Sequence, residues 1–193
     1  MEPDAVTCNA AISACEKGGH WRMVGRALSD MRQAHIEADV VGYNAAITAC
    51  ENGEQWRAAV RLFESIHLHA VRRAVVSFNA AISACGASGR WAAAMGVLSG
   101  MAARGVQADQ IGFNAAISGS EKGAQWPRAL DTLVAMARRQ VEGDAIGFAA
   151  ATSACEKSGR WQWALRVFGS MLPQRVQASL VSFNAAISAC EKG

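Results

Sequence analysis

The stretch Phe78-Asn79-Ala80-Ala81-Ile82 recurs along the chain at a fixed interval of 35 residues. Close copies lie at 43–47, 113–117 and 183–187, a copy with cysteine in the aromatic place lies at 8–12, and a diverged copy lies at 148–152. A fixed period of roughly 20–50 residues is the signature of supersecondary units stacked in a row. The sequence therefore predicts a repeat array rather than an ordinary globular domain.

Each unit contains two stretches with the apolar spacing of a helix face. In the unit 5–39 these residues are Cys8, Ala11, Ile12 and Cys15, and then Trp21, Val24, Leu28 and Met31. Glycines stand where the first stretch ends, and we expect them to provide a left-handed residue there. They are Gly18, Gly19, Gly53, Gly89, Gly123 and Gly159. The turn is only a few residues long, so the two helices must pack antiparallel.

The predicted fold is all-α, an α-solenoid in which antiparallel helix-turn-helix units wind into a right-handed superhelix. One array fills 1–193, with units at 5–39, 40–74, 75–109, 110–144 and 145–179 and a partial unit at 180–193. A link at 34–39 joins units, and we expect Ile36 to fill the joint, as Val71, Val106, Val141 and Val176 do later. Residues 2–4 resemble the tail of a preceding unit, so the ends look cut.

Tryptophan and cysteine also recur every 35 residues. Trp21, Trp56, Trp91, Trp126 and Trp161 are predicted to be the largest repeated contribution to the core. Five of the six cysteines share one place in the unit, so each is alone in its own unit. Equivalent cysteines of successive units should then lie on the order of 10 Å apart, the usual distance between packed helices. A disulfide needs α-carbons within about 7 Å. We therefore expect buried free thiols, which suggest an intracellular compartment.

Composition excludes some classes of function. The net charge of +3 permits a polyanionic partner without requiring one. No uncharged apolar run approaches the roughly 18 residues of a membrane helix, so we expect no membrane partner. The four histidines share no place in the unit, and His67 and His69 lack a cysteine or carboxylate arrangement. The sequence therefore predicts no catalytic residue, metal, cofactor or small-molecule substrate.

A polar stripe remains on the first helix once the core positions are removed. Asn9, Ser13 and Lys17 are spaced i, i+4, i+8 and so lie along one side. Stacking would align these stripes into a ladder on one surface, with its amides open to solvent; the amides suit base edges and the lysines suit phosphates. First helices about 10 Å apart would require splayed bases, as in single-stranded RNA. Alternatively, the asparagines bond the backbone or one another, and the lysines are solvated charges at helix ends.

The unit resembles a pentatricopeptide repeat. The shared features are the 35-residue length, the aromatic-Asn pair, the Gly89-Arg90-Trp91 element, the Ala164-Leu165 second helix with Phe168 and Met171, and a closing Asp. The resemblance covers residues 2–193. The tetratricopeptide repeat is the nearest alternative. Its unit has 34 residues and a different first-helix pattern, and this chain shows neither of these features.

The resemblance implies binding of single-stranded RNA with one base at each unit. The first-helix asparagine and the last residue of the unit would read the base, and an aliphatic wedge would separate successive bases. The base-reading residues would be Asn9 with Asp39, Asn44 with Ala74, Asn79 with Asp109, Asn114 with Asp144, Ala149 with Ser179, and Asn184. The wedges would be Val6, Val41, Val76, Ile111, Ile146 and Val181, and the phosphate-binding residues Lys17, Lys122, Lys157 and Lys192.

By the family's pattern an Asn-Asp pair favours uridine, which gives a loose U-N-U-U preference over the first four units, read 5′ to 3′ along the chain. Ala74 neither donates nor accepts, so the second unit should tolerate either pyrimidine, and the unit with Ala149 should discriminate poorly. The resemblance also implies a mitochondrial or plastid protein of RNA processing, editing or stability. A scaffold that binds other proteins along its concave face, without base selectivity, is the alternative.

Overall fold

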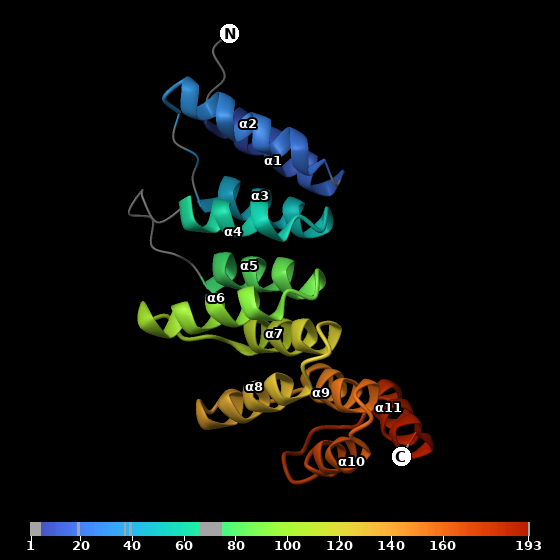
Figure 1. The fold of residues 1–193 in the computed structure, drawn as a ribbon. Helices are drawn as coiled ribbons and strands as arrows, with labels where there is room; N and C mark the ends of the chain where they lie inside the picture. The colour runs from blue at the N-terminus through green and yellow to red at the C-terminus, as the bar shows by residue number, and fades with distance from the viewer. Residues whose placement is uncertain (1–4, 19, 37, 39, 66–74, 193) are drawn as a thin grey trace.

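The computed structural model describes residues 5–18, 20–36, 38, 40–65 and 75–192, and these residues form eleven helices and no strand. The helices alternate between the first and second positions of the predicted units (Figure 1). They are α1 (Ala5–Lys17), α2 (Trp21–Gln33), α3 (Val40–Asn52), α4 (Trp56–Ser65), α5 (Val75–Ala87), α6 (Trp91–Ala103), α7 (Gln110–Lys122), α8 (Trp126–Arg138), α9 (Ala145–Lys157), α10 (Trp161–Gly169) and α11 (Leu180–Glu191).

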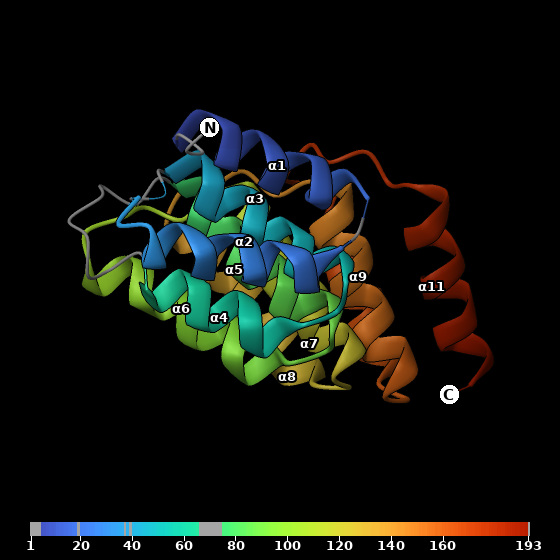
Figure 2. The same ribbon diagram turned by 90° about the horizontal axis from the view of Figure 1, so that it is seen from above.

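The helix pairs form a stack with the two termini at opposite ends (Figure 1). Each first helix packs on its own second helix and on the first helix of the next unit, so α1, α3, α5, α7, α9 and α11 form one continuous layer. Viewed along the stack, the pairs turn gradually, and α11 lies well to the side of α1 (Figure 2). The predicted all-α repeat array is confirmed.

The core follows the repeated aromatic and isoleucine residues of the first helix. Phe78, Phe113 and Phe148 are fully buried, as are the isoleucines four residues after each aromatic position in the first four units. These isoleucines are Ile12, Ile47, Ile82 and Ile117. The aromatic and the isoleucine lie on the same helix face, which places both between the layer of first helices and the second helices.

The tryptophans contribute less to the core than predicted. Trp56 is only partly buried, and Trp161 is 37% exposed. Each tryptophan begins a second helix, so it lies at the turn edge of the stack. A Cβ at Gly53 would lie 2.4 Å from Cδ1 of Trp21, so this glycine leaves room for the ring of the preceding unit.

Left-handed residues close the first helices, but not always at the predicted glycine. Gly89 and Gly159 have φ of +64° and +65°, as predicted. In the second and fourth units, Glu54 and Ala124 take this conformation instead, with φ of 55° and 54°. In these two units the glycine, Gly53 or Gly123, comes one residue earlier and is not left-handed. Its missing side chain instead leaves room for the tryptophan ring of the preceding unit.

The joints between units form as predicted. The backbone N–H groups of Ile36, Val106, Val141 and Val176 donate to the carbonyl of a methionine five residues earlier, at 2.8–3.1 Å. All four side chains pack against the core. Val71, His67 and His69 lie outside the described residues.

All six cysteines are free thiols, and their burial differs. Cys50, Cys85 and Cys155 are buried, and desolvation raises the pKa of each thiol to about 11. The prediction of burial is wrong for Cys190, which is exposed; among the described helices α11 packs mainly on α9 and α10.

We expect Cys190 to react with Ellman's reagent at neutral pH within seconds to minutes, because it is accessible to solvent. Cys50, Cys85 and Cys155 should react only after unfolding, because the thiolate is the reactive form and burial suppresses it. The absorbance of released thionitrobenzoate, with and without denaturant, measures both groups. Rapid native reaction of all six thiols would show that the first-helix layer is not packed as described.

Candidate nucleic-acid interface

A row of exposed aliphatic side chains runs along the first-helix layer. It occupies the second residue of each unit, and the members are 59–75% exposed. The row consists of the predicted wedges Val6, Val41, Val76, Ile111, Ile146 and Val181. Burial of apolar surface is favourable, so this regular row of exposed β-branched residues is a candidate contact surface.

The predicted base-reading pairs are joined by hydrogen bonds in the third and fourth units. Nδ2 of Asn79 donates to Oδ1 and Oδ2 of Asp109 at 2.9 and 3.0 Å. Nδ2 of Asn114 donates to both carboxylate oxygens of Asp144 at 3.0 Å. A carboxylate can only accept, so the amide nitrogen, rather than its oxygen, faces the aspartate.

Each aspartate is held in place because it also caps the next first helix. Oδ1 of Asp109 accepts from the backbone N–H of Gly112 at 3.0 Å. Oδ1 of Asp144 accepts from the N–H groups of Ile146 and Gly147 at 3.0 and 2.9 Å. An N-cap aspartate satisfies helix amides that otherwise have no partner. Each Asn–Asp pair is therefore anchored to the joint between two units.

The asparagine oxygens are turned toward the next unit. Oδ1 of Asn79 and of Asn114 is buried without a hydrogen-bond partner. A Cβ at Gly112 or Gly147 would lie 2.7 or 2.5 Å from these oxygens, so glycine is needed opposite each amide. Asn79 is only 7% exposed, so the expectation of amides lying open to solvent is wrong for this residue.

The second unit holds its asparagine differently. Oδ1 of Asn44 accepts from Oγ of Ser77 at 2.5 Å, and Ser77 occupies the place of Gly112 and Gly147. The predicted partners Ala74 and, in the first unit, Asp39 lie outside the described residues. Asn9 is partly buried, and its Oδ1 lacks a partner among the described residues.

The fifth unit has no amide to read a base. Ala149 is buried, and Ser179 caps α11, accepting from the N–H of Ser182 at 3.3 Å. In the partial unit Asn184 is exposed. Asn-Asp hydrogen bonds are thus present only in the third and fourth units of the described chain.

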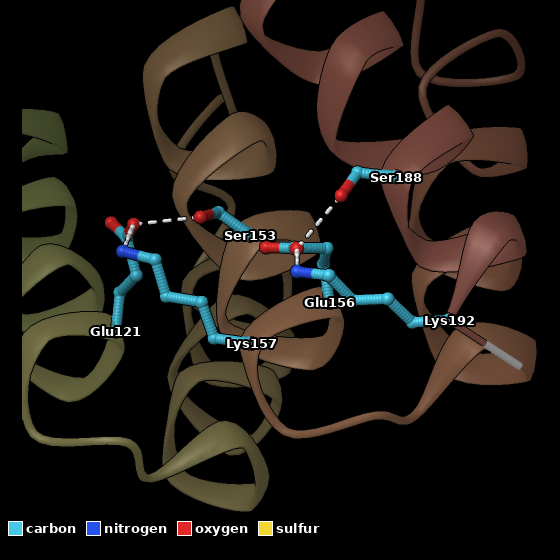
Figure 3. A network of polar contacts seen from close by, with 6 residues as sticks. All are labelled: Glu121, Ser153, Glu156, Lys157, Ser188 and Lys192. Carbon is cyan, nitrogen blue, oxygen red and sulfur yellow. Dashed lines mark hydrogen bonds and ion pairs between the residues drawn. The ribbon is translucent and has the colours of Figure 1, made fainter.

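A glutamate links the later first helices to one another. Oε1 of Glu121 in α7 accepts from Oγ of Ser153 and Nζ of Lys157 in α9, both at 2.8 Å (Figure 3). We call this arrangement a clasp: a glutamate of one first helix bound to the serine and lysine of the next. Lys157, a predicted phosphate-binding residue, therefore already has an anionic partner.

The same clasp is repeated one unit later. Oε1 of Glu156 accepts from Oγ of Ser188 at 2.9 Å and from Nζ of Lys192 (Figure 3). The hydrogen bond from Lys192 lowers the pKa of the Glu156 carboxyl, desolvation opposes this, and the Ser188 hydrogen bond adds to the lowering. The carboxyl is therefore ionised at neutral pH.

The glutamate column was missed in the sequence. It recurs every 35 residues immediately before the lysine position, as Glu16, Glu51, Glu121, Glu156 and Glu191, and Gly86 interrupts it. Glu51 accepts from Oγ of Ser83 but meets Ala87 in place of a lysine. Because of Gly86, Lys122 donates to the carbonyl oxygen of Ala87 at 3.1 Å instead of to a carboxylate.

The described part of the chain has neither a metal centre nor a membrane-spanning helix. No three His, Cys, Asp or Glu side chains there lie close enough together to hold a metal ion. None of the helices described is both long and apolar enough to cross a bilayer. The polar groups of the first-helix layer are thus the candidate site.

The sequence matches two models of one family. A model described as a pentatricopeptide repeat domain matches residues 26–88 and 131–192, and a model of the single repeat matches 6–36 and 76–106. No curated protein matches the sequence.

Solved structures share the fold. The maize pentatricopeptide repeat protein PPR10, solved in complex with an 18-nt psaJ RNA element, is 23% identical with a TM-score of 0.81 over 98% of this chain. This chain spans 28% of the length of that protein. The PPR domain of Arabidopsis thaliana protein-only RNase P 1, solved in complex with tRNA, is 14% identical with a TM-score of 0.77, covering 94% of this chain and 96% of that domain.

Proposed function

The chain belongs to the pentatricopeptide repeat family, and from this premise we propose that its first-helix layer binds single-stranded RNA with one base at each unit. Maize PPR10 and the PPR domain of the Arabidopsis RNase P, which share its fold, were solved with RNA bound. By the same premise the protein acts in organellar RNA processing, editing or stability.

The observation that carries this proposal is the alternation of exposed wedges with anchored amides. Ile111 and Ile146 stand on either side of the Asn114–Asp144 pair along the layer, each more than 60% exposed. An aliphatic side chain covers the face of a base, and the anchored pair meets its edge. Such a pairing of stacking and edge contacts is how unpaired bases are recognised.

The polar groups of the anchored pair complement the edge of uracil. The amide N–H can donate to the O4 carbonyl, and the aspartate Oδ2 can accept from N3–H. We therefore propose uridine at the third and fourth units, supported by Asn79 with Asp109 and Asn114 with Asp144. By the family's pattern the first unit also takes uridine, the second takes either pyrimidine, and the strand runs 5′ to 3′ along the chain.

Binding of labelled oligouridine and oligoadenosine, followed by fluorescence anisotropy, tests the proposal. One net hydrogen bond contributes about 1 kcal/mol, so the two anchored pairs, with one such bond each, should favour oligouridine by about 2 kcal/mol, which is roughly thirtyfold because 1.4 kcal/mol is tenfold. The double variant Asn79→Ala/Asn114→Ala should lose this preference. Asn184→Ala is the matched control, because Asn184 is exposed and forms no hydrogen bond with an aspartate among the described residues, and it should leave the ratio unchanged.

Equal affinity of the parent protein for the two oligonucleotides would contradict base reading. An oligouridine preference that survives the double variant would also contradict it. Indifference to the base would favour the protein-binding scaffold, which needs the exposed aliphatic row but not the amides.

A further inference from the structure

The lysines of the first-helix layer differ in their electrostatic surroundings. Lys157 and Lys192 each lie in a clasp with a glutamate of the preceding unit. Lys122 makes no salt bridge with any described residue, and its bond to the Ala87 carbonyl leaves two of its three N–H donors available. A carbonyl is neutral, so the charge of Lys122 is not cancelled by its partner.

A glutamate of the clasp lines the same depression as the wedges. A cavity of about 390 Å³ on this face is bounded by Ile146 and Val181 and also by Glu121 and Ser153. A strand that passes between these wedges therefore approaches the Glu121 carboxylate. Electrostatic forces act over about 8 Å at physiological ionic strength, so at this place the strand's phosphates meet a neutral Glu121–Lys157 pair instead of a free lysine.

We propose that the interruption of the glutamate column at Gly86 leaves Lys122 free to bind phosphate, while Glu121 and Glu156 hold Lys157 and Lys192 out of phosphate binding. The inference rests on the proposed RNA binding and names the residues that regulate its backbone contacts. Lys122 lies eight residues after Asn114 on α7, about 12 Å along the helix axis at 1.5 Å per residue. One helix thus presents both a base-reading amide and an uncancelled cation.

The inference makes a quantitative statement about salt dependence. For single strands, the logarithm of the affinity falls with the logarithm of salt concentration with a slope of about −0.7 for each neutralised phosphate. Lys122→Met should therefore make the slope shallower by about 0.7, so that oligouridine binding is weakened more at low salt than at high salt. Glu121→Gln should strengthen binding and make the slope steeper by about 0.7, because it removes a carboxylate and releases Lys157.

Two matched variants separate this role from a general effect of charge. Glu121→Gln/Lys157→Met removes a clasp without changing the net charge, and it should leave affinity and slope unchanged. Glu51→Gln removes a carboxylate that binds Ser83 and has no lysine to release. It should leave the slope unchanged, although affinity can rise slightly through reduced repulsion. Thermal unfolding of each variant checks that the array stays folded.

The outcomes distinguish this inference from the function on which it rests. If oligouridine is preferred and Lys122→Met changes neither affinity nor slope, the inference is overturned and RNA binding stands. Equal losses on removal of Lys122 and of the Glu121–Lys157 pair would overturn it as well. If no oligonucleotide binds, both proposals fall.

Discussion

Replacing Phe78 with alanine is expected to lower the free energy of unfolding by about 3–5 kcal/mol, the usual cost of truncating a buried aromatic side chain. Phe78 is completely buried, and its ring meets that of Phe63 edge to face, with centroids 4.7 Å apart. The cavity would open between the second and third units. Urea unfolding followed by circular dichroism measures the change as a lower midpoint.

Phe183 provides the matched control because it occupies the same place in its unit. Its ring also makes an edge contact, with Phe168 at 5.0 Å, but it is 47% exposed. Phe183→Ala should cost only about 1 kcal/mol, since less apolar area is lost from the interior. Comparable losses at the two positions would show that the aromatic column does not stabilise the array by burial.

The location of the Phe78 effect gives a second measurement. Units of a repeat array contact only their neighbours, so a cavity acts first on the adjoining interfaces. Amide hydrogen exchange should therefore accelerate most in α3, α4, α5 and α6. Uniform acceleration through α11 would instead indicate one cooperative unit over the whole chain.

The elements of this fold could be predicted because their signals are local and repeated. The aromatic and isoleucine of the first helix are four residues apart, and Ile36 follows its helix by three residues. Burial of these positions depends on helical periodicity, which one unit already shows and every later unit repeats. The tryptophans share the apolar chemistry but stand at the first residue of a second helix, and the edge of the stack leaves them partly exposed.

For the polar site, the sequence predicts which repeat positions are involved but not which contacts they make, because those contacts join different units. The stripe places Asn79 and Asn114 on one side, but their orientation depends on an aspartate 30 residues later and a glycine 33 residues later. In the second unit a serine replaces that glycine and binds the Asn44 oxygen. Similar asparagines therefore have different partners.

The partners of the lysines could not be predicted from the repeat position either. Lys122, Lys157 and Lys192 are equivalent by position, and sequence periodicity predicts one role for all of them. Their surroundings are set by the residue 36 positions earlier, which is glutamate for two of them and Gly86 for Lys122. The periodic glutamate was visible, but only the packing of α7 on α9 shows which lysine it reaches.

Gly86→Ala is expected to destabilise the protein by about 2 kcal/mol, although alanine is the better helix former by about 1 kcal/mol. A Cβ at Gly86 would lie 2.5 Å from the carbonyl oxygen of Ala115, and a Cβ at Gly119 would lie 2.8 Å from Cα of Gly86. Helices α5 and α7 therefore meet backbone to backbone, and overpacking there costs up to about 3 kcal/mol. Gly96→Ala in α6 meets nothing within 4 Å and should stabilise by about 0.5–1 kcal/mol.

The opposite signs of these two substitutions, measured by urea unfolding, test the close approach of α5 and α7. If Gly86→Ala stabilised as Gly96→Ala does, the contact between the two backbones would not exist. Gly86→Glu, which would complete the glutamate column, carries the same Cβ and should destabilise by at least as much as Gly86→Ala. The gap that leaves Lys122 without a carboxylate is therefore imposed by packing, because a side chain at position 86 would separate the two helices that present Asn79 and Asn114.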